Sequence, residues 1–197
     1  MIALVDYGAG NVGSVLKAVE YLGFPAQVAG TSAQLQAAQK IILPGQGHFG
    51  AMVAALAERG LLDALRGRIA AGTPYLGICL GLQCLYEASE EAPGVAGLGL
   101  LRGTVTRFKI LAKVPQIGWN QLQFRSEARL FHGIPDGSFA YYCHSYYGPV
   151  VPEAVSVTEY GETYSSGIEK NNVWAVQFHP EKSGEVGLKV LQNFLHL

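Results

Sequence analysis

The run Gly77-Ile78-Cys79-Leu80-Gly81 lies between an apolar stretch at residues 75–78 and an apolar stretch with helical spacing that begins at Leu80. This change of periodicity predicts a strand that enters a helix through a tight turn, with the helix extending to about residue 88. Glycines on both sides of the turn remove side chains that would collide with the strand and the helix, and the central residue is forced into a strained backbone conformation. The stretch therefore predicts one strand-turn-helix unit of an α/β fold.

Strand and helix signals alternate throughout the N-terminal half. Apolar runs predict strands and apolar residues at helical spacing predict helices, with Asn11 as a helix cap and Gly60 as a break in the longest helix. The predicted strands are residues 2–6, 25–29, 41–43 and 75–78, and the predicted helices are residues 12–22, a short segment after Ser32, and residues 51–71. This order predicts a mostly parallel sheet flanked by helices on both faces, an α/β fold of three layers.

The C-terminal half changes to short β-rich runs separated by Gly, Pro and Asn. The runs occupy residues 103–108, 114–119, 139–147, 154–160 and 173–178, and a closing helix is expected at residues 185–195. No linker and no internal repeat interrupts the chain. We therefore expect residues 1–197 to form a single domain with an antiparallel β-rich extension.

The charge balance excludes one class of partner. The chain has 14 basic and 15 acidic side chains, a net charge of −1, so it lacks the broad basic surface of a nucleic-acid-binding protein. Charged residues make up only 15% of the sequence, against about 25% in an average globular protein. A surface poor in charge suggests that part of it faces another protein.

The cysteines and the hydropathy of the sequence indicate in which cellular compartment the protein is expected. The three cysteines contain no Cys-x-x-Cys pair, so neither a disulfide framework nor a zinc site is predicted and no metal is expected. The N-terminal residues are typical of a first strand instead of a signal peptide. Gly and Pro interrupt the longest uncharged stretch, residues 69–86, so no membrane span is predicted. A cytoplasmic location follows as the expectation.

The run Gly8-Ala9-Gly10-Asn11-Val12-Gly13 matches the G-x-G-x-x-G pattern of dinucleotide-binding proteins. That interpretation also requires an acidic residue at the end of the second strand to bind the ribose. The chain has no carboxylate there, between Gly30 and Gln34. The sequence therefore favours an ordinary strand-to-helix turn, and no cofactor is expected.

Cys79 is the candidate nucleophile, because its glycine frame matches the G-x-S-x-G nucleophile elbow with sulfur in place of oxygen. At the start of a helix, free backbone amides favour a thiolate, and the amide of Leu80 is placed to stabilise an oxyanion. The alternative is that Cys79 is a small buried hydrophobic residue. Cys84 and Cys143 have no such flanking glycines, and we interpret both as small buried hydrophobic residues.

A cysteine nucleophile needs a base, and only His179 has an evident orienting partner. Glu181 follows it by two residues, and in an extended chain such residues point the same way with Cα atoms about 6.6 Å apart. Glu181 could bond one imidazole nitrogen while the other faces Cys79. The alternative is a loop histidine beside a solvated glutamate. His132 and His196 are expected at the surface.

Two other segments are candidates for the surroundings of the site. His144 and Tyr146 would share one face of a strand that is either an aromatic core strand or a pocket wall. Gln46 and Gly47 follow the third strand, whose carboxyl end should lie beside that of the Cys79 strand. Their backbone amides could supply a second oxyanion donor, and the alternative is an ordinary turn that leads to His48.

Taken together, these motifs resemble the class I glutamine amidotransferases, in which a Cys-His-Glu triad on a flavodoxin-like α/β sheet releases ammonia from glutamine. Within that family they are most similar to the glutaminase subunit of imidazole glycerol phosphate synthase, an enzyme of histidine biosynthesis. The similarity extends from residue 6 to residue 183. It rests on Asp6-Tyr7-Gly8-x-Gly10-Asn11, Pro44-Gly45-x-Gly47-His48-Phe49, the elbow through Gln83, Gly118-Trp119-Asn120, His144-Ser145-Tyr146 and Gln177-Phe178-His179-Pro180-Glu181-Lys182-Ser183.

The resemblance implies roles for individual residues. It implies Cys79 as the nucleophile, His179 as the general base and acid, and Glu181 as its orienting partner. The other implied sites are the oxyanion donors Leu80, Gly47 and Gln46, the glutamine-binding residues Gln83, Glu91, His144, Ser145 and Tyr146, and the interface residues Trp119, Asn120 and Lys182. Gln46 departs from the small apolar residue expected there, but the role involves only its backbone amide.

The resemblance also implies a partner, a (βα)₈-barrel cyclase subunit that forms a heterodimer with this chain and receives its ammonia. Three other functions stay open from the sequence. The chain could be a glutaminase subunit of another synthase, of the pyridoxal phosphate or anthranilate type. It could be a cysteine hydrolase that acts alone, or a binding module without catalytic activity.

Overall fold

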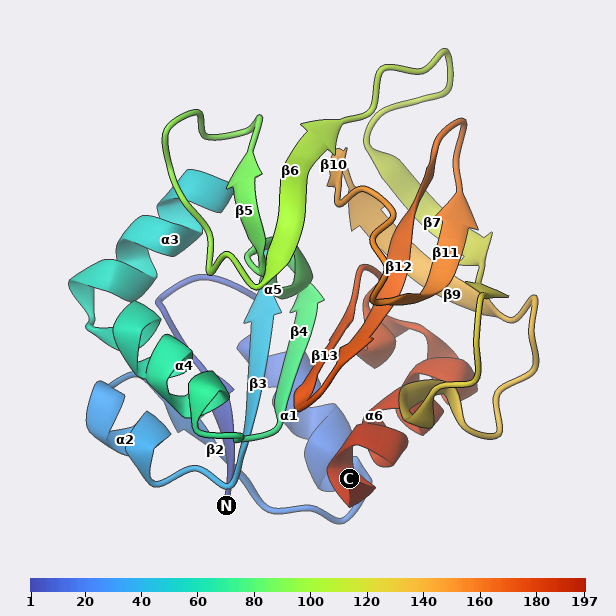
Figure 1. Cartoon of the computed structure of the whole chain (residues 1–197). Coiled ribbons are helices and arrows are strands. Elements are labelled where there is room, and N and C mark those ends of the chain that lie inside the picture. Colours follow the sequence, from blue (N-terminus) through green and yellow to red (C-terminus); the bar gives the residue numbers. More distant parts are fainter.

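A computed structural model describes the whole chain, residues 1–197, and its centre is a mixed sheet of eight strands (Figure 1). The strand order is β2-β1-β3-β4-β13-β12-β11-β8, in which the first five strands are parallel and the last three are antiparallel. These strands are β1 (Ile2–Val5), β2 (Ala26–Ala29), β3 (Lys40–Gly45), β4 (Tyr75–Cys79), β8 (Gln123–Phe124), β11 (Ala154–Glu159), β12 (Thr163–Lys170) and β13 (Val173–Val176).

Helices cover both faces of this sheet (Figure 1). They are α1 (Val12–Tyr21), α2 (Ser32–Gln36), α3 (Phe49–Glu58), α4 (Leu61–Ala70), α5 (Leu80–Gln83) and α6 (Gly184–His196), with short 3₁₀ turns η1 (Arg129–Phe131) and η2 (Pro180–Lys182). Alternate residues of β1 enter different cores: Ala3 packs with the α3 and α4 side, and Leu4 with the α1 and α6 side. All four residues of β1 are buried because the strand is covered on both faces. The predicted three-layer α/β fold is confirmed.

Two smaller sheets form only part of the predicted antiparallel extension, because the runs at residues 154–160 and 173–178 lie in the central sheet as β11 and β13, and β5 pairs with β6 in parallel. One has the order β10-β6-β5 and the other is the antiparallel pair β7 and β9. These strands are β5 (Tyr86–Ser89), β6 (Leu101–Arg107), β7 (Gln116–Gln121), β9 (Phe139–His144) and β10 (Tyr146–Tyr147). The strand expected over residues 139–147 is therefore interrupted at Ser145, and β12 was not predicted at all.

The helix expected from Leu80 to about residue 88 was wrong, because α5 ends after one turn at Gln83. The carbonyls that would continue the helix bond elsewhere: Cys84 accepts from the Leu98 amide at 2.7 Å and Leu85 from the Leu100 amide at 2.8 Å. The chain instead enters β5. The apolar spacing of this segment reflects burial and not helical structure.

None of the helices has the length and apolar character required to cross a lipid bilayer.

Candidate active site

Cys79 occupies the strained turn that its glycine frame predicts. Its backbone has φ 55° and ψ −107°, a conformation rare for any residue with a side chain. A Cβ atom on Gly77 would lie 2.5 Å from the carbonyl oxygen of Gly81, and one on Gly81 would lie 2.0 Å from that of Leu43. Only glycine fits at either position, so the close packing of β3, β4 and α5 fixes the position of the sulfur.

Parallel pairing of β4 and β13 brings the second functional segment beside the first. Val176 is in register with Ile78, so the residues that follow the two strands lie side by side. The backbone amide of His179 donates to the Tyr141 carbonyl at 2.9 Å. Ser183 Oγ donates to the carbonyl of His179 at 2.7 Å and accepts from the Tyr141 amide at 2.9 Å. These bonds attach the segment after β13 to β9.

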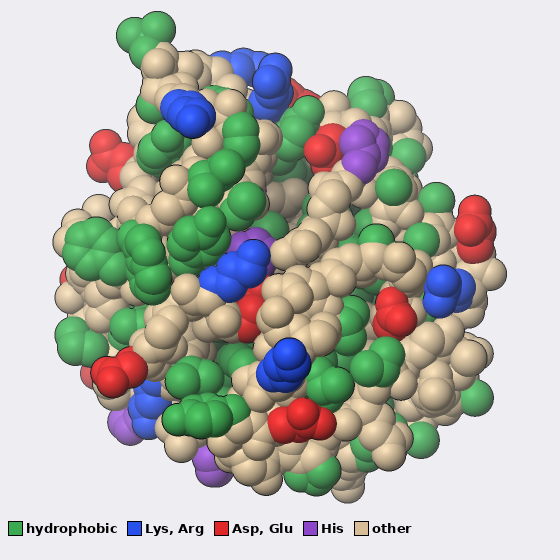
Figure 2. All heavy atoms as spheres, turned by 180° about the vertical axis from the view of Figure 1, so that it is seen from behind, with side chains coloured by type: hydrophobic (Ala, Val, Ile, Leu, Met, Phe, Trp, Pro, Cys, Tyr) green, Lys and Arg blue, Asp and Glu red, His purple; other side chains and the backbone are tan.

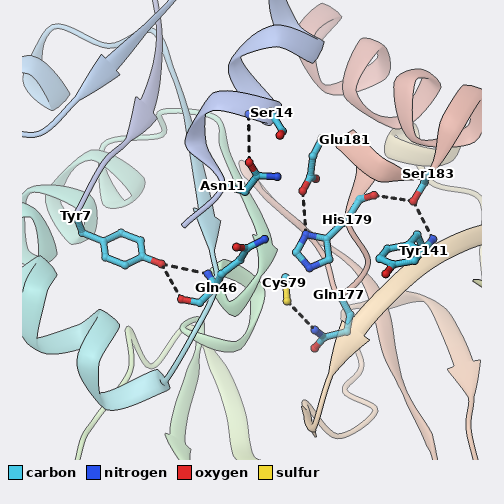
Figure 3. A network of polar contacts seen from close by, with 10 residues as sticks. All are labelled: Tyr7, Asn11, Ser14, Gln46, Cys79, Tyr141, Gln177, His179, Glu181 and Ser183. Atoms are coloured by element: carbon cyan, nitrogen blue, oxygen red, sulfur yellow. Dashed lines mark hydrogen bonds and ion pairs between the residues drawn. The ribbon is translucent and has the colours of Figure 1, made fainter. Parts of the chain in front are cut away.

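His179 lies between Cys79 and Glu181, as Figure 3 shows. Its Nδ1 is 3.0 Å from Glu181 Oε1, and the two side chains are only 4% and 1% exposed. The other carboxylate oxygen, Oε2, is buried without a hydrogen-bond partner. The ring points its second nitrogen toward the sulfur (Figure 3).

The electrostatics of this trio favour an imidazolium. Burial acts to lower the pKa of His179, but the charge of Cys79, its hydrogen bond to the ring, and Glu181 together outweigh burial and raise the pKa above its ordinary value. A histidine in such surroundings holds a proton next to the sulfur. The arrangement fits a thiolate–imidazolium pair, which is the reactive form of a cysteine nucleophile.

The segment after β3 lies on the opposite side of the sulfur from Gln177 (Figure 3). Gly45 is in register with Cys79, and a Cβ on Gly45 would lie 2.7 Å from Leu80 Cβ. Gly47 has φ +93°. The Gln46 amide donates to the Tyr7 hydroxyl at 3.3 Å, and that hydroxyl donates to the Gln46 carbonyl at 3.4 Å. The segment predicted to supply oxyanion donors thus borders Cys79, and one of its amides is bonded to Tyr7.

The predicted glutamine-binding residues fall into two groups. Gln83, at the end of α5, donates from Nε2 to the carbonyl of Tyr146 at 2.7 Å, and His144 Nδ1 lies 2.8 Å from the same oxygen. Ser145, which lies between His144 and Tyr146 in the sequence, is half-buried. Glu91 is separate, since its Oε2 accepts from the Phe49 amide at 2.7 Å at the start of α3. Both groups border the segments that meet at Cys79.

Burial determines the charge state of His144. The ring is buried among Phe108, Tyr142 and Tyr164. Burial lowers its pKa to about 4, against the raising effect of the hydrogen bond to the Tyr146 carbonyl, and the charge of His179 lowers it further. His144 is therefore neutral at pH 7.

The three predicted interface residues lie on or next to one surface. Trp119 is 56% exposed on β7, and Lys182 is exposed with its ammonium 5.9 Å from the centre of the Tyr141 ring. Asn120 is half-buried and donates to the Glu159 carbonyl at 2.8 Å. Hydrophobic side chains gather on this side of the molecule, where β7 and β9 lie (Figure 2).

Sequence reasoning did not single out Gln177 or Tyr7 as functional residues. Gln177 is fully buried, with its Nε2 at 3.6 Å from Cys79 Sγ, and Tyr7 is 2% exposed beneath the oxyanion segment. A signal was present for Gln177, because it is a polar residue in an otherwise apolar run. The turn after β1 holds Tyr7 and Gly8, and Asn11 caps α1 by accepting from the Ser14 amide at 3.4 Å. No group of three or more His, Cys, Asp or Glu side chains is arranged to bind a metal ion.

Comparison with known proteins identifies the class of protein that this fold and site define. The family model described as glutamine amidotransferase class-I matches residues 3–197. A solved glutamine amidotransferase superposes with a TM-score of 0.78 at 20% identity, covering 100% of this chain and 98% of that one. A chain of PurLQS from Thermotoga maritima gives 0.75 at 22%, covering 99% and 97%. These two structures support the fold. The chain belongs to the class I glutamine amidotransferase family.

Curated relatives assign the chain to one group within this family. Imidazole glycerol phosphate synthase subunit HisH of Chlorobium luteolum is 46% identical over 98% of both chains. The subunit of the same name from Moorella thermoacetica is 48% identical over 98% of this chain and 93% of its own. Within the amidotransferase family, the chain is thus a member of the HisH group, as its motifs indicated.

Proposed function

We propose that this chain hydrolyses glutamine through a thioester on Cys79 and delivers the ammonia to a synthase subunit that makes imidazole glycerol phosphate. One observation carries the proposal: the imidazole of His179 is placed between Cys79 and a buried Glu181 that holds its Nδ1 at 3.0 Å. The names of the curated relatives supply the identity of the pathway.

In the first half of the reaction the Cys79 thiolate attacks the side-chain amide carbon of glutamine. The negative oxygen that forms is stabilised by the backbone amides of Leu80 and of the segment containing Gln46 and Gly47. The His179 imidazolium gives its proton to the departing nitrogen, so that the C–N bond breaks and ammonia leaves. A glutamyl thioester and a neutral His179 remain.

In the second half, His179 takes a proton from water, and the hydroxide attacks the thioester carbon. The C–S bond breaks, the new carboxyl group releases its proton to solvent as glutamate leaves, and the thiolate–imidazolium pair is restored. Glu181 keeps the ring in one orientation through both halves, because its carboxylate accepts from Nδ1–H and leaves the second nitrogen free for the proton transfers.

The product ammonia requires a nearby acceptor, because in water at neutral pH it becomes ammonium and loses its nucleophilic lone pair. We propose that the acceptor is a (βα)₈-barrel cyclase that docks on the outward face of β7 and β9. Ile117, Trp119 and Phe139 on that face are 59%, 56% and 51% exposed. Its centre is next to the active site, since Tyr141 of β9 accepts from the backbone amide of His179.

The test measures glutamate release by the purified chain with and without the histidine-pathway cyclase. We expect stimulation by this cyclase, and complete loss with Cys79→Ala. Stimulation only by a pyridoxal phosphate or anthranilate synthase subunit would assign the chain to another pathway. Full activity without any partner would show a hydrolase that acts alone, and unchanged activity of Cys79→Ala would exclude the thioester.

A further inference from the structure

A chain of side-chain amides connects the backbone to the sulfur of Cys79. Gln83 Nε2 lies 2.7 Å from the Tyr146 carbonyl and 3.0 Å from Gln177 Oε1, and Gln177 Nε2 lies 3.6 Å from Cys79 Sγ. Gln177 and Gln83 are buried, at 0% and 3% exposure, and Tyr146 is half-buried. Figure 3 shows the last contact, with Gln177 on the side of the sulfur away from the oxyanion segment.

The direction of the hydrogen bonds in this series of amides is fixed at the Tyr146 carbonyl. A carbonyl oxygen can only accept, so Gln83 must present its NH₂ group to Tyr146. The same NH₂ group has a second hydrogen, which goes to an acceptor on Gln177, and that acceptor must be the amide oxygen. Gln177 therefore turns its own NH₂ group toward the sulfur. The orientation follows from hydrogen-bond chemistry, since oxygen and nitrogen of an amide are otherwise interchangeable in shape.

A donor aimed at sulfur has more effect on the thiolate than on the thiol. A thiolate is a charged acceptor, and a hydrogen bond to a charged group is about twice as strong as one between neutral groups. The site is buried, so water does not compete for this bond. His179 reaches the sulfur from another direction (Figure 3), and the mechanism above assigns Gln177 no role.

We propose that Gln177 is a catalytic residue whose side-chain amide donates a hydrogen bond to the Cys79 thiolate, held in that orientation by Gln83 and the Tyr146 carbonyl. The proposal rests on Cys79 being the nucleophile of the proposed function. The bond stabilises the thiolate relative to the thiol before glutamine binds, and it breaks when the sulfur becomes part of a neutral thioester. No atom of Gln177 is transferred.

The test follows alkylation of Cys79 by iodoacetamide as a function of pH in the full chain, in a Cys143→Ser background because Cys143 is exposed. Gln177→Met retains length and volume without a donor. We expect its alkylation profile to move upward by about one pH unit, which is about tenfold slower reaction at pH values well below the midpoint of the profile. The plateau at high pH should be equal or slightly higher, because a more basic thiolate is a better nucleophile.

The matched control is Gln116→Met, which removes a second buried glutamine that accepts from the Tyr164 hydroxyl and does not contact the sulfur. Its profile should overlap that of the parent. If Gln177→Met does not fold by circular dichroism, Gln177→Asn withdraws the donor by one methylene and should move the profile in the same direction. An unmoved profile, or a lower plateau without a shift, would overturn the proposal.

The alkylation test is independent of glutamine hydrolysis. A profile that moves as expected in a chain that does not hydrolyse glutamine would refute the proposed function and support the hydrogen bond. If the protein hydrolyses glutamine through Cys79 but the profile of Gln177→Met does not move, the proposed function is supported and the hydrogen bond is refuted.

Discussion

The Nδ1 atom of His179 and the Oε1 atom of Glu181 are 3.0 Å apart in surroundings from which water is almost excluded. The two residues are separated by only one position, and Pro180 between them starts the 3₁₀ turn η2. This short turn, and not an extended strand, brings both side chains toward Cys79. The contact is the basis of the first prediction.

Glu181→Gln retains the shape of the side chain and removes its charge. The imidazolium of His179 then loses its neighbouring anion and keeps only a neutral amide, a weaker partner, beside Nδ1. We expect kcat for glutamine hydrolysis in the complex to fall about 10²–10⁴-fold with little change in KM. The control is Glu169→Gln, which removes a charge paired with Arg129. Equal losses for both variants would contradict an orienting role.

Gly81→Ala tests the packing of the elbow. The new Cβ would lie 2.0 Å from the Leu43 carbonyl oxygen, so backbone must move. We expect a loss of more than about 3 kcal/mol in the free energy of unfolding measured with urea. Gly67→Ala, in an open position within α4, should instead stabilise by about 0.5–1 kcal/mol. Similar effects at both positions would show that the backbone relieves the clash with little loss of free energy of unfolding.

Tyr7→Phe tests whether the Tyr7 hydroxyl restrains the oxyanion segment. Without it, the Gln46 amide is free to turn toward substrate, and we expect the glutaminase rate without a partner to rise about tenfold while the stimulated rate changes little. The control is Tyr86→Phe, which removes a hydroxyl bonded to the Pro149 carbonyl. A fall in the partner-free rate would show that Tyr7 supports the competent conformation instead.

Trp119→Ala tests the docking face. Exposed aromatic residues at the centre of an interface commonly contribute about 2 kcal/mol, so we expect about 30-fold weaker binding of the cyclase by calorimetry. Tyr21 is 78% exposed on α1, which is not part of this face, and Tyr21→Ala should bind as the parent does. Unchanged affinity for Trp119→Ala would place the interface elsewhere.

His144 makes stability depend on pH. Its pKa is about 4 in the folded chain and about 6.5 in an unfolded one, so between these values the unfolded state binds a proton that the folded state does not. This contribution is complete above pH 6.5 and is lost as the pH falls toward 4, a decrease of up to about 3 kcal/mol. Urea unfolding at several pH values should show a smaller decrease for His144→Gln than for the parent. The exposed His132→Gln is the control, and parallel curves for all three proteins would refute the assignment.

The local chain was enough to predict the elbow. A strained residue between two positions where no Cβ fits requires glycine two positions before it and two positions after it, and this pattern is contiguous in the sequence. The same holds for the alternation of strands and helices in the first half and for the partnership of His179 with Glu181. The helix beyond Gln83 was predicted wrongly because hydrogen bonds from residues 98–101 end it, and these come from a distant segment.

The sequence by itself therefore determined the fold class and was enough to propose a nucleophile and a base, since each proposal depends on neighbours in the chain and on the physical limits of one backbone turn. Only the tertiary structure decided what surrounds the sulfur. Gln177 faces Cys79 because β13 pairs with β4 in one register, and Tyr7 holds Gln46 because β1 and β3 are adjacent. Such contacts join residues that are tens of positions apart, and they exist only once burial of both sheet faces has fixed the order of the strands.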